Sequence, residues 1–315
     1  MEVIELSSYT DEEKLSIAKQ HLLPKQRKKH GLKAAQLKLS DDAIREIISY
    51  YTRESGVRNL ERQIAALCRK ADVLIADGER KSLSLRSGAL QPYLGAPKFK
   101  PEHRRMTDEV GLVRGLAWTS VGGTMLPIEV SALDGTGKIE LTGNLGDVMK
   151  ESAKTAVSYI RSKCDEYGID PDFYKNKDIH IHAPEAAIPK DGPSAGLAIT
   201  TAIVSELTGI LIKSNIAMTG EISLKGKALP IGGLKEKSMA AYKAGCDTVI
   251  IPNENVKDLD EISAEVKNAV RFVSVKSFDE LLPVALVTLP KRKKDVKNNN
   301  VVIADNKSKA NIVTQ

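Results

Sequence analysis

The sequence predicts an α+β protein in which an all-α domain is followed by a mixed α/β domain. Residues 1–75 carry apolar positions at helical spacing behind good helix-capping residues. After about residue 107, alternating strand-like stretches and amphipathic or apolar helices are intermixed, without the regular strand–helix alternation of a parallel sheet. At 315 residues the chain has the length of about two domains.

Three helices are expected in the N-terminal part. Thr10 and Ser40 are good N-caps because acidic residues follow each of them, in TDEEKLSIAKQHLL and SDDAIREIISYYTRE. The second helix places one apolar stripe at Ile44, Ile47, Ile48 and Tyr51. A third helix, in GVRNLERQIAALCRKADVLIADG, has its stripe at Leu60, Ile64, Leu67 and Leu74 and ends at Gly78. A short extended piece, SLSLRSGALQPYLG, follows.

The stretch APKFKPEHRRMTDE has no periodicity and is interpreted as an interdomain linker. Beyond it, strands are expected in GLVRGLAWTSVGGTMLPIEVSAL (a hairpin with a Gly-Gly turn), KIELTG, DIHIHAP, NIAMTGEISLKGKAL (a second hairpin) and TVIIP. Helices are expected in residues 145–168, 192–209, 232–245 and 277–286.

Composition narrows the function classes. No apolar run is long enough for a membrane span, and the acidic start MEVIELSSYTDEEK does not resemble a signal peptide. Cys68, Cys164 and Cys246 lack any close pairing, which argues against a disulfide scaffold or a zinc site and favours a reducing, cytoplasmic setting. Of the net charge of +6, residues 291–315 hold +5, so a basic disordered tail explains most of it.

A serine framed by glycines, Gly192-Pro193-Ser194-Ala195-Gly196, matches the G-x-S-x-G nucleophile pattern. Ser194 is expected at the start of a helix, where unpaired N–H groups could stabilise an oxyanion. A plain N-cap serine explains the pattern about equally well.

The proton acceptor decides between these interpretations. No histidine follows Ser194, so the esterase order of a serine triad is excluded. His180 and His182 share one strand face and are candidate bases, although an ordinary strand histidine is the favoured interpretation of each. Lys237 falls on a small apolar stripe of its helix, whereas Lys235 and Lys243 can reach water. Burial would make the Lys237 amine neutral and basic enough to deprotonate Ser194.

Long ordered blocks of this sequence resemble the proteolytic domain of the Lon ATP-dependent proteases. They are PKDGPSAGLAITTAIVSELTG, MTGEISLKGKALPIGGLKEKSMAAYKAG, GLAWTSVGGTMLPIEV and LTGNLGDVMKESAKTA. The resemblance implies a catalytic dyad of Ser194 and Lys237. It also implies supporting roles at Thr219 beside the lysine amine, at His180 and His182, and at Asp191 and Gly192 in a loop that opens or closes the site.

The N-terminal part resembles the small α-helical lid domain of the Lon AAA+ ATPase module, with Arg58 at the position of the sensor-2 arginine that reaches a nucleotide. The expected division is a lid domain over 1–98, a linker over 99–106, a proteolytic domain over 107–290 and the tail over 291–315. No G-x-x-x-x-G-K-[S/T] phosphate loop occurs, so no cofactor is expected in this chain, and ATP and Mg are implied only for a full-length Lon protease. Unfolded or damaged proteins as substrates and a homo-oligomer, a hexamer at full length, are implied likewise.

Two alternatives remain open. An esterase-like serine hydrolase is one, against which the missing downstream histidine argues. The other is a basic module that uses LPKQRKKHG (Leu23–Gly31) and the tail to bind nucleic acid or polyphosphate. DNA binding would also be compatible with a Lon-like protease as an accessory property.

Overall fold

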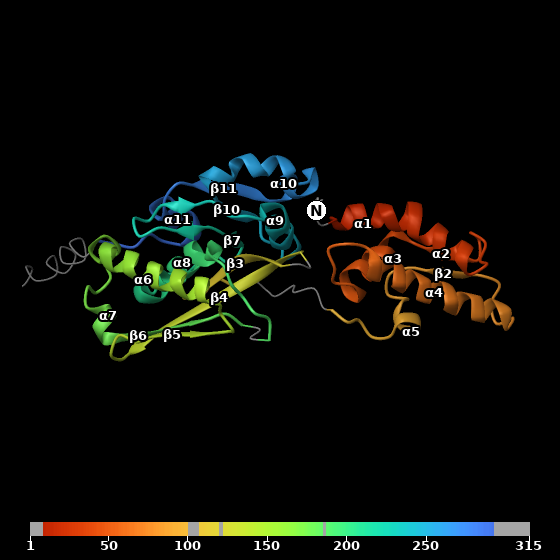
Figure 1. Cartoon of the computed structure of the whole chain (residues 1–315), viewed down its shortest axis with the longest axis horizontal. Coiled ribbons are helices and arrows are strands. Elements are labelled where there is room, and N and C mark those ends of the chain that lie inside the picture. Colours follow the sequence, from red (N-terminus) through yellow and green to blue (C-terminus); the bar gives the residue numbers. More distant parts are fainter. Residues whose placement is uncertain (1–8, 100–106, 120–121, 185–186, 293–315) are drawn as a thin grey trace, which may run out of the picture. The chain divides into compact units, whose positions relative to one another are not determined.

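The computed structural model describes residues 9–99, 107–119, 122–184 and 187–292, which divide into two compact units (Figure 1). The expected linker at 99–106 and tail at 291–315 lie almost entirely outside the described residues. None of the described helices is both long enough and apolar enough to cross a membrane.

The N-terminal unit is mainly helical, as predicted. Its helices are α1 (Asp11–Ile17), α2 (Leu23–Lys29), α3 (Asp41–Glu46), α4 (Arg58–Ala76) and α5 (Gln91–Leu94), with π-helical turns at Ala18–Leu22 and Ile47–Tyr51. Both expected N-caps are present: the Thr10 hydroxyl accepts from the Glu13 N–H, and the Ser40 hydroxyl accepts from the Ala43 N–H. Most of the predicted stripe residues form one core, in which Ile44, Ile64 and Leu67 are fully buried, whereas Leu74 is only partly buried and lies outside this core.

The N-terminal unit is not purely α-helical. Strands β1 (Leu37–Leu39) and β2 (Leu83–Leu85) pair in parallel. The second strand lies in the predicted extended piece. The first was missed because three residues are too short for alternation to be recognised.

The C-terminal unit is built on a seven-stranded mixed sheet in the order β11-β10-β7-β3-β4-β6-β5. Its strands are β3 (Leu112–Thr119), β4 (Gly122–Asp134), β5 (Ile139–Thr142), β6 (Lys177–His182), β7 (Ile216–Met218), β10 (Thr248–Pro252) and β11 (Arg271–Val275). Strands β3, β7, β10 and β11 run parallel, and β4 pairs antiparallel with β6. The sheet therefore has the mixed pairing that the sequence predicts.

Helices cover the sheet on both faces (Figure 1). They are α6 (Asp147–Tyr167), α7 (Phe173–Asn176), α8 (Gly196–Thr208), α9 (Leu234–Lys243), α10 (Ala264–Ala269) and α11 (Phe278–Ala285). Residues of α6, α8 and α11 share the larger core, and those of α9 and α10 share a second core on the opposite face. The first ten residues of α8 are all buried, as its apolar sequence predicts.

Two expected hairpins differ in the structure. Strands β3 and β4 are neighbours in the large sheet, as the first hairpin predicts, but Gly122-Gly123 begins β4 instead of forming the turn, and residues 120–121 lie outside the described residues. The stretch NIAMTGEISLKGKAL first supplies β7 to the large sheet, and only then forms a small hairpin from β8 (Glu221–Ile222) and β9 (Ala228–Leu229). All three residues of β7 are buried, as is typical of a parallel strand covered on both faces. The stretch is too short for this difference from a hairpin arm to be recognised in the sequence.

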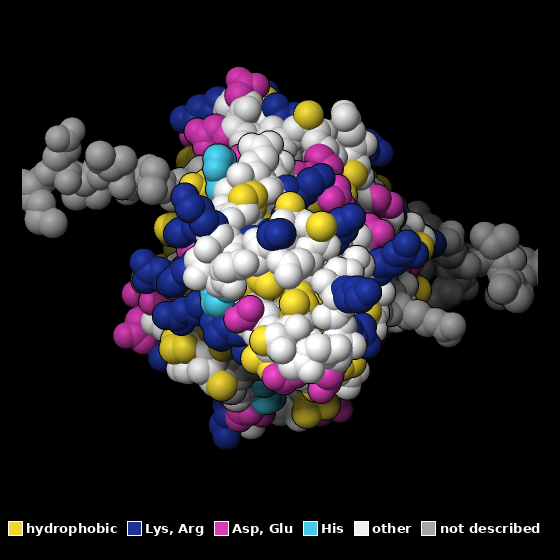
Figure 2. Space-filling model, turned by 90° about the vertical axis from the view of Figure 1, so that its right-hand side faces the viewer, with side chains coloured by type: hydrophobic (Ala, Val, Ile, Leu, Met, Phe, Trp, Pro, Cys, Tyr) yellow, Lys and Arg dark blue, Asp and Glu magenta, His cyan; other side chains and the backbone are white. Residues whose placement is uncertain are grey.

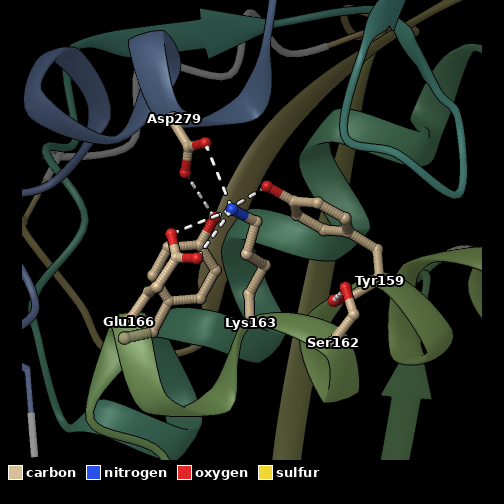
Figure 3. A network of polar contacts seen from close by, with 6 residues as sticks. Tyr159, Ser162, Lys163, Glu166 and Asp279 are labelled. Carbon is tan, nitrogen blue, oxygen red and sulfur yellow. Dashed lines mark hydrogen bonds and ion pairs between the residues drawn. The ribbon is translucent and has the colours of Figure 1, made fainter.

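A polar network joins the C-terminal half of α6 to the start of α11 (Figure 3). The hydroxyls of Tyr159 and Tyr167 are 2.8 Å apart, and Tyr167 donates to Asp279 Oδ1 at 2.7 Å. Lys163 Nζ contacts Glu166 at 2.9 Å and Asp279 at 4.0 Å. Burial raises the pKa of Tyr167, so this phenol stays protonated and remains a donor to Asp279.

Candidate active site

Ser194 lies in the one-turn 3₁₀ helix Pro193–Ala195 that leads directly into α8. Gly192 precedes it with φ of 125°, a conformation that a residue with a Cβ atom rarely adopts. The glycine therefore permits the sharp turn that places the half-buried Ser194 at the helix start. The turn leads into a helix as the nucleophile pattern requires, but strand β6 ends at His182, so no strand runs directly into this turn.

The backbone of Ser194 is held by residues 219 and 220. The Ser194 carbonyl accepts from the Gly220 N–H at 2.9 Å and from the Thr219 hydroxyl at 3.4 Å. In return, the Leu197 N–H donates to the Gly220 carbonyl at 3.0 Å. One of the helix N-terminal donors that the sequence offers for an oxyanion is therefore already engaged.

Lys237 points into the protein from the first turns of α9. Its residue exposure is 3%, and its amine donates to the Thr219 hydroxyl at 3.2 Å, the sole hydrogen-bond partner found for it among the described residues. Burial lowers the pKa of this amine to about 8. Thr219 itself is fully buried and links the lysine amine to the Ser194 carbonyl.

The other lysines of α9 lie in different surroundings. Lys235 is half-buried and Lys243 is exposed, whereas Lys237 shares the buried face with Leu234, Ala240 and Ala241. The apolar stripe read from the sequence thus selects the buried lysine of this helix.

Asp191 anchors the loop before Ser194 to helix α6. Its Oδ1 accepts from the Met149 N–H at 3.0 Å and from the Gly192 N–H at 2.9 Å. The carboxylate therefore caps the positive end of α6 from outside the helix. A Cβ atom at Gly146 would lie 2.2 Å from Asp191 Cγ, so glycine is needed there for this approach. The sequence pattern contained no signal for this contact.

His180 and His182 point to the same face of β6, as their spacing predicts. Thr142 Oγ1 of β5 lies 2.8 Å from His180 Nε2 and 2.7 Å from His182 Nδ1. The hydrogen bonds found among the described residues join these rings to Thr142 and not to Ser194. A supporting role of either histidine in catalysis stays a prediction.

Arg58 is the first residue of α4, and its side chain is exposed. The Glu54 carboxylate accepts from the N–H groups of Asn59 and Leu60, both at 2.8 Å, and so fixes the start of this helix. The nucleotide-sensing role of Arg58 stays a prediction, because its nucleotide site would lie on another part of a Lon protease.

The Gly-Lys pairs of the sequence do not form phosphate loops. Gly137-Lys138 precedes strand β5, and Gly226-Lys227 precedes strand β9, whereas a phosphate loop opens a helix with its N–H groups. Across the described ranges, no group of three or more His, Cys, Asp or Glu side chains is arranged to hold a metal ion. The two Gly-Lys pairs therefore do not have the backbone setting of a phosphate loop.

The basic stretch Leu23–Gly31 includes helix α2, and part of its charge is used inside the N-terminal unit. Lys25 pairs with Glu61 at 2.8 Å, and Arg27 donates to the Leu37 carbonyl. Over the face shown in Figure 2, basic side chains are spread among acidic and apolar ones. The other half of the proposed nucleic-acid surface, the tail from residue 293, lies outside the described residues.

Two family descriptions match the chain. The Lon protease (S16) C-terminal proteolytic domain matches residues 84–288, and the Lon protease AAA+ ATPase lid domain matches residues 28–83. The junction of the two matches lies before the linker expected at 99–106, so the exact domain boundary stays a prediction.

Curated bacterial proteins are similar along most of the chain. Lon protease 1 of Bacillus subtilis (strain 168) is 53% identical over 287 residues, which are 91% of this chain and 37% of that protein. Lon protease of Clostridioides difficile (strain 630) is 53% identical over 288 residues, 91% of this chain and 37% of that protein. Lon protease of Geobacter metallireducens is 51% identical over 290 residues, 92% of this chain and 35% of that protein. The chain thus spans little more than a third of the length of these relatives.

Proposed function

Because this chain belongs to the Lon protease family, we propose that its C-terminal unit is a serine peptidase in which Ser194 attacks the peptide bond and Lys237 carries the proton. The observation that carries the proposal is the buried Lys237 amine. It donates to the Thr219 hydroxyl, which in turn donates to the backbone carbonyl of Ser194. A Ser-Lys pair needs no histidine, which agrees with the absence of any histidine after residue 182.

The proposed reaction has two stages. In the first, the neutral Lys237 amine takes the proton of Ser194 Oγ as this oxygen attacks the substrate carbonyl. The resulting ammonium then protonates the leaving amine as the peptide C–N bond breaks, which leaves an ester on Ser194. In the second, a water molecule gives a proton to Lys237 and attacks the ester, and the ammonium returns the proton to Ser194 Oγ.

The surroundings of Lys237 suit this role. With a pKa of about 8, the amine has a neutral fraction at neutral pH that an ordinary lysine lacks. Thr219 accepts a hydrogen bond from the amine and so fixes its position. We further propose that Asp191 and Gly192 set the conformation of the nucleophile loop through the cap on α6.

The test is hydrolysis of an unstructured polypeptide, without ATP, by the wild type and by Ser194→Ala, Lys237→Met and Lys235→Met. Both of the first two variants are expected to lose at least about 1,000-fold in kcat, because the nucleophile and its base act as a unit. Lys235→Met is the matched control on the same helix, and its activity is expected to stay within about twofold of the wild type. Hydrolysis that survives in Lys237→Met would contradict the dyad.

The alternative of an esterase-like hydrolase predicts different results for variants of this chain. It would require a histidine base, so His180→Ala or His182→Ala would abolish hydrolysis while Lys237→Met would not. Hydrolysis of a simple ester by the wild type alone does not separate the two, because a serine peptidase also cleaves activated esters.

Properties of a whole Lon protease are proposed for this chain only as part of such a protein. There, the chain would supply the peptidase and the lid, with Arg58 facing a nucleotide held elsewhere, and with ATP and Mg, a hexameric assembly and unfolded or damaged protein substrates. Three buried free thiols, Cys68, Cys164 and Cys246, support a reducing compartment such as the cytoplasm.

A further inference from the structure

Four residues, Pro230–Gly233, join strand β9 to helix α9 and so set where the helix of Lys237 begins. Two of them are glycines, and Gly233 adopts a left-handed conformation with φ of 69°. Space is open beside Gly232, where a Cβ atom would meet nothing within 4 Å. Neither glycine brings a side chain that could fix the connection, so another group must hold it.

Asn255, from the 3₁₀ helix Asn253–Glu261 that follows β10, is that group. It is 1% exposed, and its side-chain amide forms hydrogen bonds with both the N–H and the carbonyl of Ile231. Its Oδ1 accepts from the Ile231 N–H at 3.0 Å, and its Nδ2 donates to the Ile231 carbonyl at 2.8 Å. The second Nδ2 proton goes to Asp258 Oδ2 at 2.6 Å.

We propose that Asn255 is a positioning residue for Lys237: by holding Ile231, it fixes the start of α9 and with it the contact of the lysine amine with Thr219. The inference rests on the peptidase function proposed above. Lys237 lies six positions after Ile231, and the Lys237 N–H already donates to the Gly233 carbonyl at 3.0 Å, so the connection leads directly into the turn that bears the lysine.

Apolar packing alone does not explain the position of the helix. Leu234 and Ala241 bury α9 against Ala217, Val249 and Ile251 of the sheet. Such packing is non-directional, and small side chains such as Ala240 and Ala241 resist sliding along the helix axis only weakly. The paired hydrogen bonds from Asn255 are directional and set the axial position.

Asn255→Asp tests the proposal because it keeps the shape of the side chain and replaces the Nδ2 donor with an acceptor. The variant carboxylate can still accept from the Ile231 N–H, but its second oxygen would face the Ile231 carbonyl and Asp258, so two hydrogen bonds are replaced by repulsion. We expect kcat to fall about 10- to 100-fold with KM within about twofold of the wild type, because a displacement near 1 Å of a catalytic group has an effect of this size.

The pKa of Lys237 distinguishes a positioning role of Asn255 from a purely structural one, because a loss of stability alone would leave this pKa unchanged. A displaced amine regains hydration, so its pKa should rise from about 8 towards the ordinary value by about one unit, and the rising limb of the pH–rate profile should move to higher pH with it. Burial is the one cause identified for the lowered pKa of Lys237. NMR of ¹³Cε-labelled lysine, assigned with Lys237→Met, follows the pKa directly and needs no activity.

Two further variants separate the hydrogen bonds between Asn255 and Ile231 from other effects of the substitution. The double variant Asn255→Asp with Asp258→Asn restores a hydrogen bond between residues 255 and 258 but leaves the Ile231 carbonyl without its partner. We expect it to regain thermal stability and to keep the raised pKa of Lys237. Asn215→Asp is the matched control: Asn215 also donates its amide to an aspartate, Asp247, at 2.7 Å, and its variant should leave the titration of Lys237 unchanged.

The proposal is wrong if Lys237 titrates at its wild-type position in Asn255→Asp and the activity falls only with the folded fraction. Loss of the proposed function gives another pattern: Lys237→Met would then hydrolyse peptides as the wild type does, whatever Asn255→Asp does to the pKa.

Discussion

Lys237 carries a positive charge below about pH 8 at a place where water does not solvate it. The desolvation that makes the amine a base therefore also opposes folding. With an ordinary pKa in the unfolded chain, the charged form costs up to about 3 kcal/mol at neutral pH.

Replacing this residue by Lys237→Met is expected to stabilise the folded protein by about 1–3 kcal/mol at pH 7 while abolishing hydrolysis. The pKa of Lys237 is lowered in the folded state, so the cost is fully present below about pH 8 and disappears as the pH rises towards 10.5. The stabilisation gained by Lys237→Met should therefore decrease over the same pH range. Urea unfolding of both proteins at pH 7 and pH 10 measures it, and a gain that is equal at the two pH values would contradict the assignment.

Local patterns in the sequence were sufficient to nominate Ser194 and Lys237 as candidates. A glycine-framed serine before an apolar helix and a lysine on an apolar stripe are both readable within about ten residues. Thr219 as the partner of the amine came from family resemblance. Asn255 was missed because its partner Ile231 lies 24 residues earlier and no periodicity connects them.

Among the secondary-structure elements, helices α6 and α11 are joined by polar groups as well as by apolar packing. Tyr167 bridges Tyr159 and Asp279 in the network of Figure 3. Both contacts are made by one buried hydroxyl, so its loss leaves the buried Tyr159 hydroxyl without this partner, whereas the half-exposed Asp279 keeps water and Lys163.

Tyr167→Phe is accordingly expected to lower the free energy of unfolding by about 1–3 kcal/mol, since the ring still fills its space but the hydroxyl is gone. Tyr242→Phe is the matched control, because the contact of Tyr242 with Glu265 at 2.9 Å is exposed and water can replace it. Thermal unfolding should show a clear loss for the first variant and a change within about 0.5 kcal/mol for the second. Equal losses of stability in the two variants would contradict the expectation that burial makes the hydrogen bonds of Tyr167 more important than an exposed one.

Long elements were predicted well and short ones poorly. Helices α6, α8 and α9 have enough turns for their spacing to be recognised, and β6 shows a clean alternation of buried isoleucines with histidines. Strand β11, Arg271–Val275, was missed because its burial pattern is mixed. Strand β7 was expected as a strand but in the wrong pairing, since it is short and buried throughout. Pairing between distant strands could not be read from the sequence at all, since it depends on contacts and not on local spacing.

At the scale of the whole molecule, the two units have separate cores. The N-terminal core lies within residues 15–94, and the two cores of the C-terminal unit lie within residues 113–286. Each unit therefore buries its own apolar surface, as an independently folding domain does.

Leu67→Ala should consequently destabilise the N-terminal unit by about 2–5 kcal/mol and leave hydrolysis of short peptides unchanged. The matched variant Ile203→Ala, at an equally buried position of α8, should destabilise the C-terminal unit and reduce hydrolysis as that unit unfolds. Calorimetry is expected to resolve two transitions, each shifted by one variant. A single transition shifted by both would contradict independent folding.

The strand order of the large sheet also sets when the proposed site can form during synthesis of the chain. Strand β3 pairs with β7, and β7 with β10, so the centre of the sheet waits for residues that leave the ribosome about 100–140 positions after β3 begins. The Thr219 N–H is held by the Ile250 carbonyl at 3.1 Å, so the partner of the lysine amine is fixed only after residue 250 is made. In the proposed dyad, Ser194 is therefore made before Lys237 and before the strand that holds Thr219, so the site can assemble only late in synthesis.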